Sequence, residues 1–287
     1  MRAEGKSKHN DQKGSTMATE HRPMEGDWAL ILGASSGFGG ATALELARLG
    51  LHIFGVHLDR KGTLPNVERI TGQIRATGRE AVFFNVNAAD AEKRQEILNE
   101  IQARIQAAGG KSMVRVLLHS LAFGTLKPFI TKAPADAIAK SHLEMTLDVM
   151  ANSLVYWVQD LVARQLMGRS GRIFAMTSAG GARVWSTYGA VSAAKAALES
   201  HIRQLTLELA PLGITANAIM AGVTDTPALR KIPGSDEMIT WAQRKNPCGR
   251  LTTTKDVAEA IGLLSQSKAQ WITGNVICVD GGEFIVD

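Results

Sequence analysis

Three side chains between residues 178 and 195 have the types and spacing needed for acid–base work on a carbonyl oxygen. Tyr188 can donate a hydrogen bond or a proton to a substrate oxygen, and Ser178 can hold the same oxygen from the other side. Lys195 follows Tyr188 by seven residues, or two helical turns, so both can project from one helix face. An ammonium beside a phenol favours the phenolate, so we expect Lys195 to lower the pKa of Tyr188 from about 10. Taken alone, the same spacing also suits one core residue and one solvated charge.

A glycine-rich turn upstream provides a candidate phosphate site. The apolar run 28–32 is followed by the turn and then by a helical pattern that ends at Gly50. Glycines let the backbone approach a pyrophosphate, and a helix N-terminus supplies free N–H groups and partial positive charge. Strand, turn and helix in this order predict a dinucleotide site. The turn residues assigned to it are Gly33, Ser35, Ser36, Gly37, Phe38 and Gly39.

Four segments together resemble the short-chain dehydrogenase/reductase family over residues 27–287. They are the glycine turn, Asn87 after an apolar strand, the set of Ser178, Tyr188 and Lys195, and residues 222–226 after another strand. The C-terminal run 278–282 is also similar. The resemblance implies one α/β domain at residues 25–287, a Rossmann fold with a doubly wound parallel sheet and helices on both faces. It implies a nicotinamide cofactor and no metal.

Three departures from the common family pattern resemble the enoyl-acyl-carrier-protein reductase branch. Most members place the tyrosine four residues before the lysine, where this chain has Val191. Ketone-reducing members carry an asparagine for a proton relay near Met150, although a shifted alignment would bring Asn152 there. The run 118–123 resembles the His-Ser-x-Ala-Phe motif of enoyl reductases.

The resemblance therefore implies NAD(P)H-dependent reduction of the 2,3 double bond of an enoyl thioester in fatty acid synthesis. Tyr188 would stabilise the enolate oxygen, Lys195 would bind the nicotinamide ribose, and Ser178 would be an auxiliary donor. Two alternatives stay open. One is a carbonyl reductase or alcohol dehydrogenase of the same family, acting on a 3-ketoacyl thioester, a steroid or a sugar. The other is a non-catalytic dinucleotide-binding protein.

The end of the second strand bears on the choice of nucleotide. An acidic residue there binds the ribose hydroxyls of NAD, and basic residues accommodate the NADP phosphate. The usual acidic position is His57, while Asp59 stands two residues on and is followed by Arg60 and Lys61. Arg60 and Lys61 favour NADPH, with NADH possible; a solvated turn at residues 59–61 is a nearly equal alternative.

Further cofactor contacts follow from the resemblance alone. Asn87 matches an adenine contact, and Ser120 lies at the carboxyl end of a strand, where open α/β sheets bind ligands. After a later strand, Gly222 begins the segment in which the Thr224 backbone would meet the nicotinamide carboxamide and the Thr226 hydroxyl the pyrophosphate. His119, beside Ser120, is expected to be a structural hydrogen-bonding residue.

Hydrophobic periodicity predicts alternating strands and helices. Residues 114–119 are nearly continuously apolar, as expected for a parallel strand covered on both faces. The expected strands are 28–32, 51–58, 81–86, 114–119, 172–176, 214–220 and 276–279. The expected helices are 65–78, 90–108, 143–167, 191–209 and one capped by Thr254.

Residues 226–247 occupy the segment that closes over the substrate in the family. Their apolar members could line an acyl pocket, and their basic members could meet an acidic acyl-carrier protein. An amphipathic surface helix explains them equally well. The apolar members are Leu229, Ile232, Met238, Ile239 and Trp241; the basic ones are Arg230, Lys231, Arg244 and Lys245. A homotetramer is implied by the resemblance alone.

Composition excludes several classes of protein. The net charge of +5 is mild and lacks the aromatic interleaving of nucleic-acid-binding proteins. No apolar run approaches the roughly 18 residues of a membrane span. The two cysteines, Cys248 and Cys278, form no disulfide framework and suit a reducing cytoplasm. Residues 1–24 are polar and aperiodic, as in a disordered leader, and Met17 or Met24 could be the true start.

Overall fold

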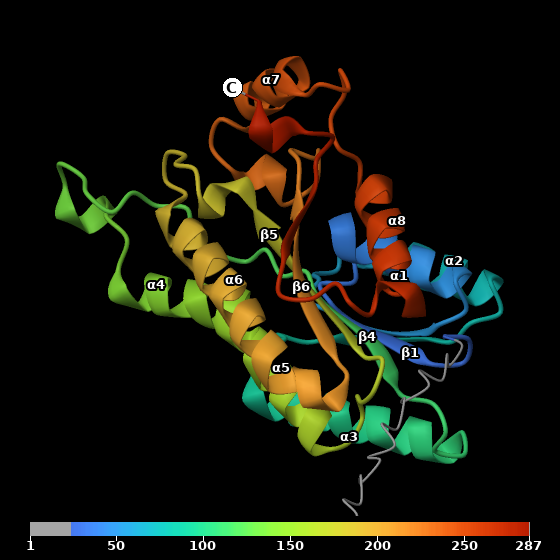
Figure 1. The fold of residues 1–287 in the computed structure, drawn as a ribbon. Coiled ribbons are helices and arrows are strands. Elements are labelled where there is room, and N and C mark those ends of the chain that lie inside the picture. The colour runs from blue at the N-terminus through green and yellow to red at the C-terminus, as the bar shows by residue number, and fades with distance from the viewer. Residues whose placement is uncertain (1–23, 287) are drawn as a thin grey trace, which may run out of the picture.

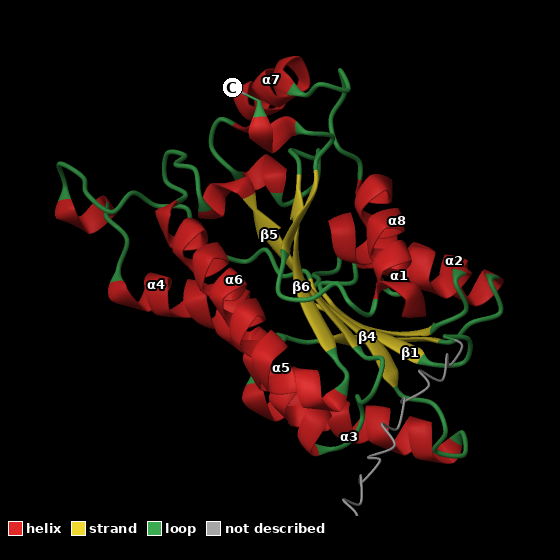
Figure 2. Cartoon of the chain, viewed as in Figure 1, coloured by secondary structure: helices red, strands yellow, loops and turns green. Residues whose placement is uncertain are grey.

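Seven parallel strands form one sheet in the computed structural model, which describes residues 24–286. The strand order is β3-β2-β1-β4-β5-β6-β7, and helices flank the sheet on both faces (Figure 2). The predicted Rossmann fold is confirmed, whereas the predicted leader lies outside the described residues except for Met24. The strands are β1 (Trp28–Leu32), β2 (His52–His57), β3 (Ala81–Asn85), β4 (Val114–His119), β5 (Arg172–Ser178), β6 (Thr215–Ala221) and β7 (Val276–Val279).

Two helical layers bury the two faces of the sheet in separate hydrophobic cores. Helices α3, α5 and α6 pack on one face, and α1, α2 and α8 on the other (Figure 1). The helices are α1 (Gly37–Arg48), α2 (Leu64–Ala76), α3 (Ala91–Ala107), α4 (Lys140–Leu147), α5 (Ser153–Ala163), α6 (Gly189–Leu209), α7 (Ser235–Lys245) and α8 (Thr254–Leu264).

The central strands are buried on both faces because helices cover both. All residues of β1 and β4 are buried, which explains why β1 is entirely apolar and β4 is mostly apolar. Leu32 at the end of β1 pairs with Val56 of β2 and with His119 of β4. Further along the sheet, Ser178 pairs with Ala221. This register brings the segments after β1, β4, β5 and β6 to one edge of the sheet, where such folds bind ligands.

Most predicted boundaries lie within one or two residues of the observed ones, and three differences bear on the site. The expected long helix 143–167 is divided by a π-helical segment, Asp148–Asn152, between α4 and α5. Next to this segment, the Ser153 hydroxyl donates to the Val149 carbonyl at 2.8 Å. Strand β5 reaches Ser178, so this serine ends the strand. Thr253 caps α8, because its hydroxyl accepts from the Asp256 amide at 3.2 Å, and Thr254 is the first helical residue.

The segment after β6 contains a 3₁₀ turn, Leu229–Lys231, followed by α7. Helix α7 and the C-terminal end of the chain lie together beyond the carboxyl ends of β5 and β6 (Figure 1). In residues 24–286, no helix is both long and apolar enough to cross a bilayer. The same residues contain no cluster of histidine, cysteine or acidic side chains that could hold a metal ion.

Replacing Trp157 by phenylalanine tests the packing of α5. The Trp157 ring is fully buried, and its Nε1 donates to the Ala88 carbonyl at 2.8 Å. The phenylalanine variant loses this donor and leaves unfilled volume, so we expect the free energy of unfolding to fall by about 2–4 kcal/mol in urea titrations followed by circular dichroism. Trp271→Phe is the control, since this ring is 97% exposed. Equal stability of the two variants would contradict the packing described.

Candidate active site

The three candidate catalytic residues are positioned by β5 and α6. Ser178 ends β5, Tyr188 is the residue immediately before α6, and Lys195 lies two turns into that helix. Buried residues recur every three to four positions along α6, and Lys195 is one of them. Its side chain therefore points toward the sheet, as theirs do. These buried neighbours are Val191, Ala194, Leu198, Ile202 and Leu205.

Lys195 is only 5% exposed, and its Nζ donates to the Met176 carbonyl of β5 at 2.6 Å. Burial lowers the pKa of Lys195 to about 8, while the carboxylate of Glu199 acts in the opposite direction and raises it. Most Lys195 side chains are therefore charged at neutral pH, and they lose the proton as the pH rises through 8.

The expectation that Lys195 lowers the pKa of Tyr188 is wrong. Burial raises the pKa of Tyr188, and a hydrogen bond with the Ser178 hydroxyl offsets this only in part. The physical reason is that the phenol lies in a poorly solvated site, which disfavours its anion, while the Lys195 ammonium is directed to the Met176 carbonyl. Tyr188 is thus a neutral phenol at neutral pH and can donate a hydrogen bond or a proton.

The backbone around Tyr188 is shaped to fit its ring. A Cβ added at Gly180 would lie 2.5 Å from Cε1 of Tyr188, so any larger residue would displace the ring. The Gly180 amide donates to the Ser178 hydroxyl at 3.1 Å. Thr187, directly before the tyrosine, has a φ of 64°, which is uncommon for a β-branched residue. Such backbone outliers cluster at functional sites.

Val191 and Met150 form an apolar wall beside this site. A Cβ placed on Gly124 would lie 2.7 Å from Cγ2 of Val191 and 2.8 Å from Sδ of Met150, so both side chains contact the same glycine. Both are buried. The Asn152 amide oxygen instead lies 3.1 Å from Nε2 of His201 on α6. Asn152 therefore contacts the helix that carries Lys195, and the alternative alignment with Asn152 in the relay position stays a prediction.

The glycines after β1 allow the turn to pack closely against neighbouring backbone, where a side chain would not fit. Gly33 has a φ of 93°, and a Cβ there would lie 2.3 Å from the Ser120 carbonyl oxygen. A Cβ on Gly39 would lie 2.1 Å from the carbonyl oxygen of Gly33. Gly37 has a φ of 55°, and a Cβ there would lie 3.8 Å from Cγ2 of Thr226. The turn therefore lies close to Ser120 and Thr226, two of the other residues predicted to bind the cofactor.

The N-terminus of α1 can accept an anion. Ser36 is the residue before the helix, and its side chain makes no capping hydrogen bond. The first-turn amides are thus available to a phosphate group. Phe38 packs partly buried against the core under α1 and holds the turn on the sheet. These features fit the pyrophosphate of a nicotinamide dinucleotide.

Asp59 is held against the glycine turn. Its carboxylate lies 2.9 Å from Nδ1 of the buried His57. Burial acts to raise the pKa of Asp59, but hydrogen bonds from Thr63, Ser35 and His57 outweigh it and lower that pKa. The Arg60 side chain is exposed and forms none of the ion pairs found within residues 24–286. The Asp59 carboxylate thus already has hydrogen-bond partners, whereas the Arg60 guanidinium is accessible to a ligand.

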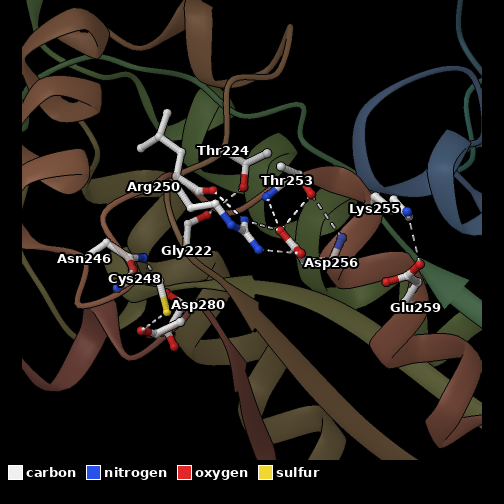
Figure 3. A network of polar contacts seen from close by, with 12 residues as sticks. Gly222, Thr224, Asn246, Cys248, Arg250, Thr253, Lys255, Asp256, Glu259 and Asp280 are labelled. Atoms are coloured by element: carbon white, nitrogen blue, oxygen red, sulfur yellow. Dashed lines mark hydrogen bonds and ion pairs between the residues drawn. The ribbon is translucent and has the colours of Figure 1, made fainter.

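The segment after β6 is supported from behind by the C-terminal end of the chain. The Thr224 hydroxyl donates to the Gly222 carbonyl at 3.0 Å, and the Thr226 hydroxyl accepts from the Leu229 amide at 3.2 Å. The Val223 amide donates to the Glu283 carboxylate at 3.2 Å. Figure 3 shows Gly222 and Thr224 next to the polar network around Asp280. This contact was not predicted from the sequence, although Glu283 directly follows the run 278–282.

Three remaining predicted residues surround these segments. The Ser120 amide donates to the Leu32 carbonyl at 2.8 Å, which ties the segment after β4 to the glycine turn. Asn87 is exposed after β3, and its side-chain oxygen accepts from the Ala89 amide at 3.0 Å. His119 is fully buried, and its Nε2 lies 2.9 Å from the Ser153 hydroxyl. Burial and the nearby Lys195 lower the pKa of His119 to about 3, so it is neutral.

Two residues beside the site were missed from the sequence. The Thr177 hydroxyl donates to Oε1 of Glu199 at 2.6 Å, and this carboxylate raises the pKa of Lys195. The available signal was spacing, because Glu199 follows Lys195 by four residues and therefore shares its helix face.

Comparison with known proteins adds independent information. A family model described as Enoyl-(Acyl carrier protein) reductase matches residues 33–283. The chain is 28% identical over 267 residues to 1-cyclohexenylcarbonyl-CoA reductase of Streptomyces collinus, covering 90% of this chain and 87% of that protein. It is 31% identical over 255 residues to a 3-oxoacyl-(acyl-carrier-protein) reductase of Aggregatibacter actinomycetemcomitans, covering 88% and 97%. The enoyl-(acyl-carrier-protein) reductase (NADH) structure from Aquifex aeolicus VF5 superposes with a TM-score of 0.77 at 26% identity, covering 92% and 98%.

Replacing Gly39 by alanine tests the glycine turn. The added methyl group would meet the Gly33 carbonyl oxygen at 2.1 Å and displace the turn. We expect the Kd for NADPH and NADH, measured by fluorescence titration, to rise at least about tenfold, which corresponds to about 1.4 kcal/mol. Gly62→Ala is the matched control, because an added Cβ there has no neighbour within 4 Å. Unchanged binding by a folded Gly39→Ala variant would rule out the assigned site.

Proposed function

Because the chain belongs to the enoyl-(acyl-carrier-protein) reductase family of short-chain dehydrogenases/reductases, and is therefore an oxidoreductase, we propose that it reduces the 2,3 double bond of an enoyl thioester. One observation carries the proposal. Tyr188 stands seven residues before Lys195, while Val191 and Met150 form an apolar wall where carbonyl reductases of the family, by the resemblance, have their tyrosine and relay asparagine. An apolar wall cannot exchange protons with an alkoxide.

The residues present suit conjugate reduction. A nicotinamide dinucleotide bound at the glycine turn supplies the hydride that adds to the β-carbon. Negative charge then develops on the thioester oxygen, which the neutral phenol of Tyr188 would stabilise by donating a hydrogen bond that strengthens in the transition state. A proton from solvent then adds to the α-carbon of the enolate and completes the saturated thioester. The Ser178 hydroxyl orients the phenol, and the Lys195 ammonium adds positive charge to the same side of the site.

The name of one relative supports the same substrate class. The Streptomyces collinus protein is a 1-cyclohexenylcarbonyl-CoA reductase, a name that denotes a thioester with a ring double bond beside its carbonyl. Apolar side chains near Tyr188 are suited to an acyl group of this kind. Phe129 is half exposed, and one of its ring carbons lies 2.5 Å from the position of a Cβ on Gly189, next to Tyr188.

A second candidate is reduction of a 3-oxoacyl thioester. The Aggregatibacter relative, at 31% identity, is named a 3-oxoacyl-(acyl-carrier-protein) reductase. In that reaction Tyr188 would protonate an alkoxide directly. Its buried, neutral phenol carries the proton that this step requires.

The deciding experiment is an assay of purified protein with crotonyl- and acetoacetyl-thioesters, in which oxidation of the cofactor is monitored. Turnover of crotonyl-thioester supports enoyl reduction, and turnover of acetoacetyl-thioester alone supports the second candidate.

We propose NADPH as the preferred cofactor. The Asp59 carboxylate is already bound by Ser35, Thr63 and His57, so it is poorly placed to accept ribose hydroxyl groups. Arg60 and Lys61 are exposed at the same edge and can bind the additional phosphate of NADPH.

The carrier of the acyl group and the assembly of the chain are also proposals. Arg230 is a poor contact for an acidic carrier protein, because Asp225 and Asp236 already neutralise it at 2.6 Å and 2.5 Å. Lys231 and Arg244 remain exposed and can meet such a partner. In α7 only Ala242 is fully buried, which agrees equally with an amphipathic surface helix.

We retain the homotetramer as a proposal, which sedimentation velocity of the purified protein would test.

Tyr188→Phe tests the assigned donor. The variant keeps the ring packed against Gly180 but removes the hydroxyl, so kcat for enoyl reduction is expected to fall about 100- to 1,000-fold. The Kd for NADPH should change little. Lys195→Ala is expected to reduce kcat and to weaken NADPH binding as well. Full activity of Tyr188→Phe would show that another group stabilises the thioester oxygen.

Arg60→Ala tests the choice of nucleotide. Loss of the guanidinium is expected to raise the KM for NADPH about tenfold and to leave the KM for NADH unchanged, because only NADPH carries the additional phosphate. Arg203→Ala, at an exposed position of α6, is the control for a change of net charge. A wild-type preference for NADH that is lost in Asp59→Asn would instead assign ribose binding to the carboxylate.

A further inference from the structure

Three consecutive residues of β5 each hold one group of the active site. The Met176 carbonyl accepts from Nζ of Lys195 at 2.6 Å, and the Ser178 hydroxyl and the Tyr188 ring lie against the same glycine, Gly180. Between them, the Thr177 hydroxyl donates to Oε1 of Glu199 at 2.6 Å. Glu199 is therefore fixed by the same strand that fixes Lys195 and Tyr188, although no step of the reaction has been assigned to it.

Glu199 and Lys195 lie against the same glycine. A Cβ added at Gly181 would lie 3.4 Å from Oε1 of Glu199 and 3.5 Å from Cβ of Lys195. The two side chains are four residues apart on α6, so they share one face of the helix. Within residues 24–286 Glu199 takes part in no ion pair, so its negative charge acts on Lys195 through space.

The other titratable groups that face Lys195 are neutral at neutral pH. His119 approaches from β4, and burial together with Lys195 lowers its pKa to about 3. Tyr188 is the residue before the same helix, and burial raises its pKa, so its phenol is also neutral. Glu199 is thus the group in the described part of the chain that offsets the cost of burying the Lys195 ammonium.

From this arrangement we infer that Glu199 is a positioning residue that keeps Lys195 protonated in the working enzyme, and that Thr177 holds Glu199 in place for this purpose. The inference rests on the proposed function only for the role of Lys195 in catalysis. The electrostatic effect itself belongs to the protein without substrate and can be measured there.

Glu199→Gln tests the inference directly. Glutamine keeps the shape and the oxygen that accepts from Thr177 but removes the charge. The pKa of Lys195 would be measured by NMR titration of protein labelled with ¹³C at lysine Cε, with the resonance assigned through its loss in Lys195→Arg. We expect the pKa of Lys195 to fall by about one unit in Glu199→Gln. Glu208→Gln is the matched control on the exposed face of α6, and it should leave the pKa unchanged.

A pH profile of the reaction gives the second readout. The alkaline limb of kcat for enoyl reduction should move to lower pH by the same amount in Glu199→Gln, with activity near pH 6.5 retained. Thr177→Val should move it in the same direction, and Thr177→Ser should restore the wild-type profile. An unchanged Lys195 pKa, or an activity loss equal at every pH, would overturn the inference and leave Glu199 a structural role. If no enoyl thioester is turned over, the proposed function fails, while the NMR titration still decides the inference.

Discussion

The buried ammonium of Lys195 is the constraint on which the site depends. A charge removed from water is costly unless its donors are satisfied and an opposite charge is near. Here the Met176 carbonyl accepts one N–H, and Glu199 supplies the opposing charge. Both partners are fixed by β5, a strand paired on both sides in the middle of the sheet. A strand with neighbours on both sides therefore carries the electrostatics of the site.

Once Lys195 is fixed, the geometry of α6 decides which earlier residue can reach the substrate. Val191, four residues before, is on the buried face of the helix and packs with Met150 against Gly124. Tyr188, seven residues before, precedes the first turn, where the backbone is free to leave the helical path. The left-handed Thr187 and the absence of a side chain at Gly180 then let its ring lie beside Ser178. A tyrosine at this spacing thus depends on an irregular backbone before the helix.

The sequence was sufficient for the elements and for most of the site. Apolar runs located all seven strands, and the strand–turn–helix context located the glycine turn. What it could not provide was set by long-range packing. The direction of the Tyr188 pKa depends on burial of its ring, and the occupation of Asp59 depends on Ser35 from a different strand end. Glu199 matters because Thr177 lies opposite it, a contact between residues 22 positions apart. The π-helical segment 148–152 has no periodicity of its own that would mark it.

The same packing bears on the choice between the two candidate reactions. Reduction of a ketone leaves an alkoxide that must take the tyrosine proton in every turnover, so the resulting phenolate has to be reprotonated through a path to water. In conjugate reduction the charge is shared over an enolate, which takes its proton at the α-carbon from solvent. The tyrosine then has to stabilise the enolate oxygen by a hydrogen bond and can keep its own proton. Burial makes the Tyr188 phenol a weak acid, and Val191 and Met150 exclude polar groups from the neighbouring wall. A weakly acidic donor beside an apolar wall is better suited to stabilising an enolate than to repeated proton transfer.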